Sequence, residues 1–231
     1  MAKPFRLYVC SDIHASERTW RKLLNATKAN LYKADAVLIA GDLTGKALVA
    51  VVKGEEGGEA WTATVLGQRR VARDEAELAE LERSIADLGY YAVRVTPEER
   101  ARMEADPGLV RSLFHEKIAE RMKEWLVLAA ERLDGSGVPV YLMRGNDDDF
   151  EIDPLLETST YCRNVNEQVV DLTPWHQLVS MGWSSPTPWS TPRELPEEDF
   201  LDRLSGLMRG VRDARKTVMM THVPPYDSGL D

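Results

Sequence analysis

The sequence predicts an α/β fold built on a parallel sheet, and two observations lead to this prediction. Four apolar runs indicate buried strands, because turn-forming or polar residues bound each of them; they are Leu7–Cys10, Ala36–Ala40, Val138–Met143 and Thr217–Met220. Between the first two runs, Glu17–Lys28 carries Trp20 and Leu24 at helical spacing. A strand, a helix and a second strand in this order form the βαβ unit of a parallel sheet.

The segment 46–135 has a different character and predicts an insertion. Ala47–Val52 and Ala60–Leu66 flank a glycine-rich turn, which is the pattern of a β-hairpin. Asp74–Leu88 and Leu109–Leu133 each carry the apolar stripe of an amphipathic helix. We expect this insertion, a hairpin with two or three helices, to border the site and to contribute to the choice of substrate.

After the insertion the chain returns to short strands and helices. Gln168–Leu172 and Gln177–Met181 are predicted strands, and Pro196–Val211 is a predicted helix. Residues 183–192 contain two tryptophans and three prolines, which predicts an ordered loop. We therefore expect a single domain over residues 1–231, interrupted by the insertion.

The charge balance and the cysteine content restrict the partners and the compartment. With 38 acidic and 29 basic residues the net charge is −9, so a nucleic-acid partner is disfavoured. Only Cys10 and Cys162 are present, which implies no disulfide framework and fits a reducing compartment. No run approaches the roughly 18 apolar residues of a membrane-spanning helix. We therefore expect a cytoplasmic protein without a membrane partner.

A polar motif stands at the end of each of the four predicted strands: Asp12-Ile13-His14, Gly41-Asp42, Gly145-Asn146-Asp147 and Thr221-His222. In open α/β sheets, ligands bind beyond the carboxyl ends of the strands. Carboxylate oxygens, imidazole nitrogens and amide oxygens are ligands of divalent metals. We therefore predict a metal site whose ligands are Asp12, His14, Asp42, Asn146 and His222.

Each motif alone is ordinary, and only the set is informative. Gly-Asp and Gly-Asn dipeptides are common in turns, and His222 before two prolines can simply end a strand. Asp12 and His14 are two residues apart, so both can bend toward one ion. The carboxylate of Asp42 can bridge two ions about 3.5–4 Å apart. Two such ions lower the pKa of a bridging water toward roughly 7 and hold the phosphoryl oxygens during in-line attack, so no protein nucleophile is required.

With these motifs in this order, the sequence resembles the calcineurin-like metallophosphoesterases. The run Thr221-His222-Val223-Pro224-Pro225-Tyr226 is similar to the bacterial and archaeal ICC-like branch, and the resemblance covers residues 1–45 and 138–231. It implies a four-layered α/β/β/α sandwich of two mixed sheets, and two divalent metal ions such as Mn, Fe, Zn or Ni. It also implies the ligand roles: Asp12 and His14 on the first metal, Asp42 bridging, and Asn146 with His222 on the second.

The sequence departs from the family pattern at two places. Asn146 and Asp147 are the predicted catalytic residues, but many relatives carry a His at the second position, where it approaches the leaving group or the phosphoryl oxygens. An Asp beside cations is normally ionised and a poor general acid, so a leaving group of low pKa, and hence a phosphodiester, is favoured. The family also closes its site with a downstream Gly-His-x-His motif. The sequence up to Asp231 lacks it, so we expect the natural chain to continue.

The sequence therefore predicts a dinuclear metal-dependent phosphoesterase that cleaves a small phosphodiester with a metal-bridging water as nucleophile. Two alternatives stay open. One is a phosphomonoesterase, and the other is a degenerate scaffold of the same fold that serves protein interaction through its insertion. A nuclease fits poorly with the net charge of −9.

Overall fold

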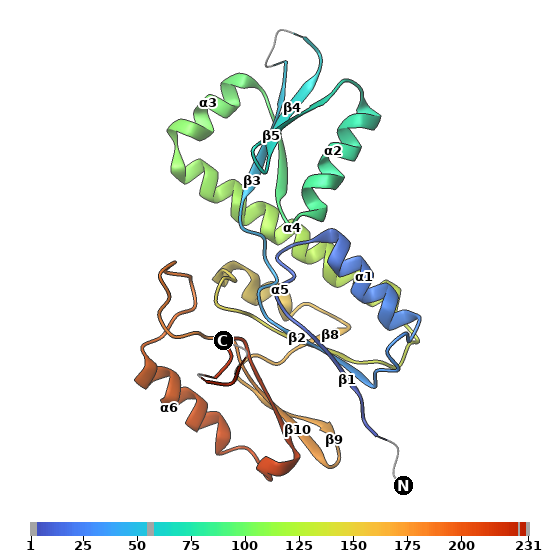
Figure 1. Cartoon of the computed structure of the whole chain (residues 1–231), viewed down its shortest axis with the longest axis vertical. Coiled ribbons are helices and arrows are strands. Elements are labelled where there is room, and N and C mark those ends of the chain that lie inside the picture. Colours follow the sequence, from blue (N-terminus) through green and yellow to red (C-terminus); the bar gives the residue numbers. More distant parts are fainter. Residues whose placement is uncertain (1–3, 55–57, 226, 230–231) are drawn as a thin grey trace. The chain divides into compact units, whose positions relative to one another are not determined.

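The computed structural model describes residues 4–54, 58–225 and 227–229 (Figure 1). The chain divides into two compact units. The first, which we call the core unit, comprises Met1–Ile13, Leu24–Leu43 and Trp125–Asp231, and the second, the insertion unit, comprises His14–Leu23 and Thr44–Glu124. Two helices, α1 (Glu17–Lys28) and α4 (Pro107–Leu133), contribute residues to both units. The helix α1 has the bounds that its apolar spacing predicts.

A parallel four-stranded sheet forms the first layer of strands in the core unit. Its strands, in spatial order, are β1 (Leu7–Cys10), β2 (Ala36–Ala40), β7 (Val140–Met143) and β8 (Cys162–Asn164). All neighbouring pairs run parallel, with Cys10 opposite Ile39 and Ala40 opposite Met143. The strand β2 is buried along its whole length, as expected of a central strand in a parallel sheet.

A three-stranded mixed sheet forms the second layer. Its spatial order is β11 (Thr217–Thr221), β10 (His176–Met181) and β9 (Val169–Thr173). The strands β10 and β11 are parallel, because the chain crosses over through α6 (Glu197–Met208), whereas β9 and β10 are antiparallel. Short helical turns lie in the connections: η1 (Phe150–Ile152), α5 (Asp153–Leu156) and η2 (Ala214–Lys216).

The apolar side chains of the two sheets pack together in the core unit. One buried cluster draws from both sheets and contains Ala36, Leu38, Ala40, Tyr141, Met143, Val165, Val170, Leu178 and Met220. Burial of such side chains stabilises the fold by about 25 cal/mol per Å² of apolar surface. The core unit is thus a sandwich of two sheets, which confirms the predicted α/β class. One detail of the expectation is wrong: of the two sheets of the core unit, only the sheet β11-β10-β9 is mixed, since every described pair in the other sheet is parallel.

The insertion unit has a sheet of its own, in the order β5 (Gln68–Ala72), β4 (Trp61–Val65), β3 (Leu48–Lys53) and β6 (Tyr91–Val95). The strands β3 and β4 are antiparallel, with Val52 opposite Thr62, which confirms the predicted hairpin. Residues 55–57 of its turn lie outside the described residues. The strand β6 pairs in parallel with β3 and β5 pairs with β4, so the insertion contains more sheet than the sequence predicts.

The helices of the insertion begin at clear capping residues. The side chain of Asp74 accepts a hydrogen bond from the N–H of Glu77 at 2.8 Å and starts α2 (Glu75–Asp87). Thr96 and Glu99 form a capping box at the start of α3 (Pro97–Ala105). The apolar stripe of α2 packs on the sheet in a cluster of Val51, Ala63, Val65, Ala72, Leu78, Leu81 and Ile85. Among the helices of the described residues, none has the length and apolar character needed to cross a bilayer.

Candidate metal centre

Asp12 and Asp42 lie directly beyond the carboxyl ends of β1 and β2. Because these strands are parallel neighbours, their carboxyl ends share one edge of the sheet. Both residues have a left-handed backbone, with φ of 56° and 53°, and Gly41 has φ of 95°. The N–H of Asp12 donates to the carbonyl of Gly41 at 3.0 Å. Left-handed backbone is uncommon outside glycine and gathers at functional sites, so these turns mark the sheet edge where two carboxylates are held.

Two glycines allow the loops after β2 and β7 to interlock. A Cβ on Gly41 would lie 2.6 Å from the Cα of Gly145, and a Cβ on Gly145 would lie 2.1 Å from Oδ1 of Asp42. Real Cβ atoms do not approach other atoms this closely, so only glycine fits at either position. The Gly-Asp and Gly-Asn dipeptides therefore bring two loops into contact, and do more than form turns.

The carboxylate of Asp148 ties the same two loops together. Its Oδ1 accepts from the N–H of Leu43 at 2.8 Å, and its Oδ2 accepts from the N–H of Gly145 at 2.7 Å. The side chain of Asp148 is fully buried, with 0% of the residue exposed. Buried donors need such partners, so Asp148 holds the loop geometry. Nothing in the local sequence predicts this role for Asp148.

Ligand atoms from two of the predicted metal ligands lie close together in the core unit. Asp12 and Asp42 each offer a carboxylate oxygen, and these atoms lie within 4.8 Å of one another. His14, two residues after Asp12, is the first residue of the insertion unit. The Nδ1 of His14 lies 3.3 Å from the carbonyl oxygen of Thr44. Because a carbonyl only accepts, this contact puts the hydrogen on Nδ1, so Nε2 is the ring nitrogen whose lone pair suits a cation. Two carboxylates and an imidazole suit a borderline divalent cation such as Mn, Fe or Zn.

His222 brings a second imidazole to Asp42. It follows β11, and its Nδ1 lies 2.8 Å from the carbonyl oxygen of Ala40, which places the ring hydrogen on Nδ1. The other ring nitrogen, Nε2, lies 3.3 Å from Oδ1 of Asp42. Metal-ligating histidines commonly donate one N–H to a carbonyl and bind the metal with the other nitrogen. The orientation of His222 fits that arrangement.

The two predicted catalytic residues occupy the turn after β7. The backbone N–H of Asp147 donates to Oδ1 of Asp42 at 3.1 Å. The side-chain Nδ2 of Asn146 donates to Oγ1 of Thr191 at 2.8 Å, and its backbone carbonyl accepts from the N–H of Arg193 at 3.1 Å. With Nδ2 engaged, Oδ1 is the amide atom of Asn146 that suits a cation. Thr191 and Arg193 belong to none of the sequence motifs, and their only sequence signal is that they lie in or next to the predicted ordered loop 183–192.

Arg193 is a buried cation beside this turn. It is 3% exposed, and its guanidinium lies 4.2 Å from the ring centroid of Phe150. Its Nη2 bonds a carboxylate oxygen of Asp153 at 2.5 Å, and the other carboxylate oxygen pairs with Arg144 at 2.6 Å. Burial lowers the pKa of the Arg193 guanidinium, and the charge of Asp153 opposes that shift. Arg193 thus anchors its loop by one ion pair and several hydrogen bonds.

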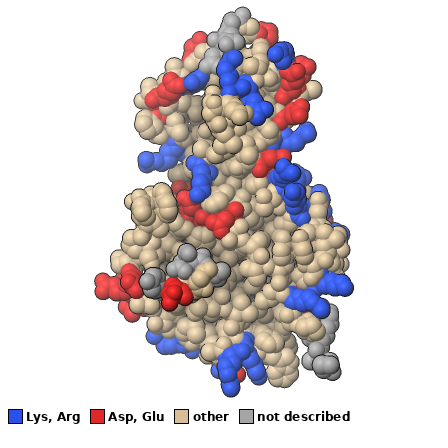
Figure 2. All heavy atoms as spheres, viewed as in Figure 1, with Lys and Arg blue, Asp and Glu red and all other residues tan. Residues whose placement is uncertain are grey.

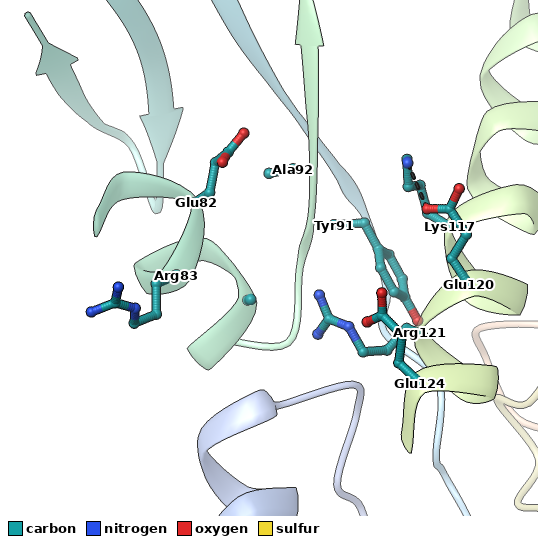
Figure 3. A pocket seen from close by; sticks show the side chains of 9 residues that line it. Glu82, Arg83, Tyr91, Ala92, Lys117, Glu120, Arg121 and Glu124 are labelled. Atoms are coloured by element: carbon teal, nitrogen blue, oxygen red, sulfur yellow. Dashed lines mark hydrogen bonds and ion pairs between the residues drawn. The ribbon is translucent and has the colours of Figure 1, made fainter. Parts of the chain in front are cut away.

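The insertion unit contains a cavity of about 310 Å³, which Figure 3 shows between α2, β6 and α4. Its lining is charged with both signs. Lys117 pairs with Glu120 at 2.6 Å, and Arg121 donates to the carbonyl of Ala15 at 2.9 Å with its guanidinium 5.6 Å from the ring centroid of Tyr91. The predicted metal ligands do not line this cavity.

Comparison with known proteins supports a family resemblance. Residues 5–86 match the family described as calcineurin-like phosphoesterase. The match continues into the segment 46–86, which the sequence analysis had placed outside the resemblance, and it does not include residues 138–231. No curated protein matches the chain.

Two solved structures share the fold. One covers 96% of this chain and 70% of its own, with a TM-score of 0.54 and 12% identity. The other, the crystal structure of TT1561 of Thermus thermophilus, covers 99% of this chain and 72% of its own, with a TM-score of 0.52 and 12% identity. At this identity the likeness concerns the fold alone.

Proposed function

We infer that this protein is a metal-dependent hydrolase of phosphoric esters, because its residues 5–86 match the calcineurin-like phosphoesterases. The observation that carries this proposal is that the carboxylates of Asp12 and Asp42 lie within 4.8 Å of one another at the ends of neighbouring strands. His222 adds a nitrogen 3.3 Å from Asp42. Assignment to the ICC-like branch remains a prediction.

The donor set fits a divalent cation. Carboxylate oxygens of Asp12 and Asp42 and ring nitrogens of His14 and His222 are ligand types that Mn, Fe, Zn and Ni accept. We propose Asn146 as a further ligand and two ions in total, with Asp42 shared between them. Bound cations would supply the Lewis acidity that lowers the pKa of a water and offsets charge on the phosphoryl oxygens.

The protein's own part in the reaction is to hold these groups in place. Asp42 is 5% exposed and accepts the N–H of Asp147, so its carboxylate has little freedom to turn away. The ring of His222 is held by its hydrogen bond to the carbonyl of Ala40, and Asp148 joins the loops that follow β2 and β7. Ligand groups that are held in place in this way need no reorganisation during the reaction.

We propose a phosphodiester as the preferred substrate. Asp147 occupies the position next to Asn146, where a histidine would be able to protonate a leaving group. A carboxylate close to cations is ionised at neutral pH and is therefore a poor proton donor to a leaving group. Substrates whose leaving group is stable as an anion are then favoured, and phosphomonoesters with poor leaving groups are disfavoured.

We further propose a small phosphoester as the partner and the cytoplasm as the compartment. Figure 2 shows basic and acidic side chains interspersed over the face in view, a pattern that does not favour a nucleic-acid backbone. Cys10 and Cys162 are free thiols, and burial raises the pKa of Cys162 to about 12. Unpaired cysteines of this kind suit a reducing environment.

The test combines metal content with hydrolysis of two matched substrates. Protein reconstituted with Mn²⁺ is assayed on bis(p-nitrophenyl) phosphate and on p-nitrophenyl phosphate. We expect bound metal and a higher kcat/KM for the diester. A higher kcat/KM for the monoester would contradict the diester preference, and bound metal without either activity would favour the scaffold alternative.

A further inference from the structure

A loop far along the chain grips the turn that carries Asn146. We call residues 187–194 the brace loop; it lies between β10 and α6 of the core unit. Oγ1 of Thr191 accepts from Nδ2 of Asn146 at 2.8 Å. Arg193 donates its backbone N–H to the carbonyl of Asn146 at 3.1 Å and its Nε to the carbonyl of Asp148 at 2.7 Å. The brace loop therefore holds this turn by both its backbone and its side chains.

The hydroxyl of Thr191 has a defined polarity. Its Oγ1 lies 2.7 Å from Oε1 of Glu194, and a carboxylate oxygen only accepts, so the hydroxyl hydrogen points to Glu194. Toward Asn146 the hydroxyl can then only accept. Asn146 must therefore present its NH₂ group to Thr191, and its Oδ1 is left for another partner. The chemistry of its neighbours therefore fixes which way the amide of Asn146 is turned.

Glu194 is itself held in place. Its Oε1 also accepts from the backbone N–H of Thr191 at 2.8 Å and from the hydroxyl of Thr187 at 2.5 Å. These hydrogen bonds, led by those from Thr187 and Thr191, lower the pKa of Glu194 to about 2. Thr187 bonds this carboxylate but not Asn146, so it is connected to Asn146 only through Glu194 and Thr191.

We propose that Thr191, held by Glu194, is the positioning residue that turns the amide oxygen of Asn146 toward the metal centre. The proposal rests on the proposed function, because it assigns that oxygen to the divalent cation of the same site. Beyond that function, it states that the brace loop sets the orientation of the Asn146 side chain, although Thr191 lies 45 positions after Asn146 in the sequence.

The test measures Mn²⁺ affinity by calorimetry on metal-free full-length protein. Thr191→Val keeps the side-chain shape but removes the hydroxyl, and we expect a 10- to 100-fold weaker affinity, roughly the usual effect of losing a partner of a metal ligand. Thr191→Ser restores the hydroxyl and should restore the affinity. Thr187→Val is the matched control, because it removes a hydrogen bond to the same carboxylate without touching Asn146, and its affinity should match that of the wild type.

A second readout does not depend on metal. The side-chain NH₂ of Asn146, followed by ¹⁵N NMR in metal-free protein, should exchange slowly with solvent in the wild type and faster in Thr191→Val or in Glu194→Gln. Wild-type Mn²⁺ affinity in Thr191→Val, with that exchange unchanged, would overturn the proposal. A wild-type protein that binds no Mn²⁺ would overturn the proposed function instead, and with it the assignment of the amide oxygen to a cation.

Discussion

Gly145 and Asp42 lie in such close contact that the loop after β7 rests on the carboxylate after β2. A Cβ on Gly145 would lie 2.1 Å from Oδ1 of Asp42 and 2.4 Å from its backbone nitrogen. The glycine is therefore part of how the candidate metal centre is built: it lets the turn bearing Asn146 and Asp147 approach Asp42 directly.

Replacement of Gly145 by Ala should destabilise the protein. The added methyl group must displace Asp42 or the turn, and overpacking of this kind costs about 1–3 kcal/mol. We expect a lower free energy of unfolding in urea and weaker Mn²⁺ binding, since a displaced Asp42 no longer faces His222. Gly58→Ala is the control, because a Cβ at Gly58 meets nothing within 4 Å. Equal stability of the two variants would contradict the close approach.

The replacement Asp147→His tests the basis of the diester preference. A histidine at this position can carry a proton at neutral pH and assist a poor leaving group. We expect the ratio of kcat/KM for bis(p-nitrophenyl) phosphate over that for p-nitrophenyl phosphate to fall in this variant. An unchanged ratio would mean that the residue next to Asn146 does not control the choice of leaving group.

The brace loop should respond to acid through Glu194. The pKa of this carboxyl is about 2 in the folded protein and 4.5 for an ordinary Glu, so its ionised form is stabilised by folding. Its contribution to stability is present above pH 4.5 and is lost as the pH falls through about 2. The Tm of Glu194→Gln should therefore lie below that of the wild type at about pH 6, and the difference should shrink between pH 4.5 and about 2. A constant Tm difference over this pH range would show that Glu194 is not ionised while it accepts these hydrogen bonds.

The sequence predicted those strands whose apolar runs have sharp polar boundaries. The bounds of β1 and β2 match the prediction, whereas β7 begins at Val140, two residues after the predicted start. The strands β5 and β6 were missed for a physical reason. Gln68–Ala72 has Arg69 and Arg70 at its centre, and in Tyr91–Val95 Arg94 interrupts the apolar run before the strand ends. Pairing with β4 and β3 makes them strands.

The proximity of Asp12 and Asp42 was predictable, because β1 and β2 are parallel neighbours and end at one edge of the sheet. Their role as metal ligands stays a prediction. The residues that hold the site were not predictable, because their contacts join distant parts of the chain. The bond from Leu43 to Asp148 spans 105 positions, and that from Asn146 to Thr191 spans 45. No local pattern in the sequence reports such contacts.

The central claim, a metal centre organised around Asp42, is tested most directly by the metal content of Asp42→Asn. This variant keeps the size of the side chain but removes its charge and one ligand oxygen. Metal per chain, measured by mass spectrometry after reconstitution with Mn²⁺, should fall, and Mn²⁺-stimulated hydrolysis should be lost while unfolding stays cooperative. Asp171→Asn, which alters a surface carboxylate paired with Arg212, should retain the wild-type metal content. Wild-type metal content and full activity in Asp42→Asn would contradict the account.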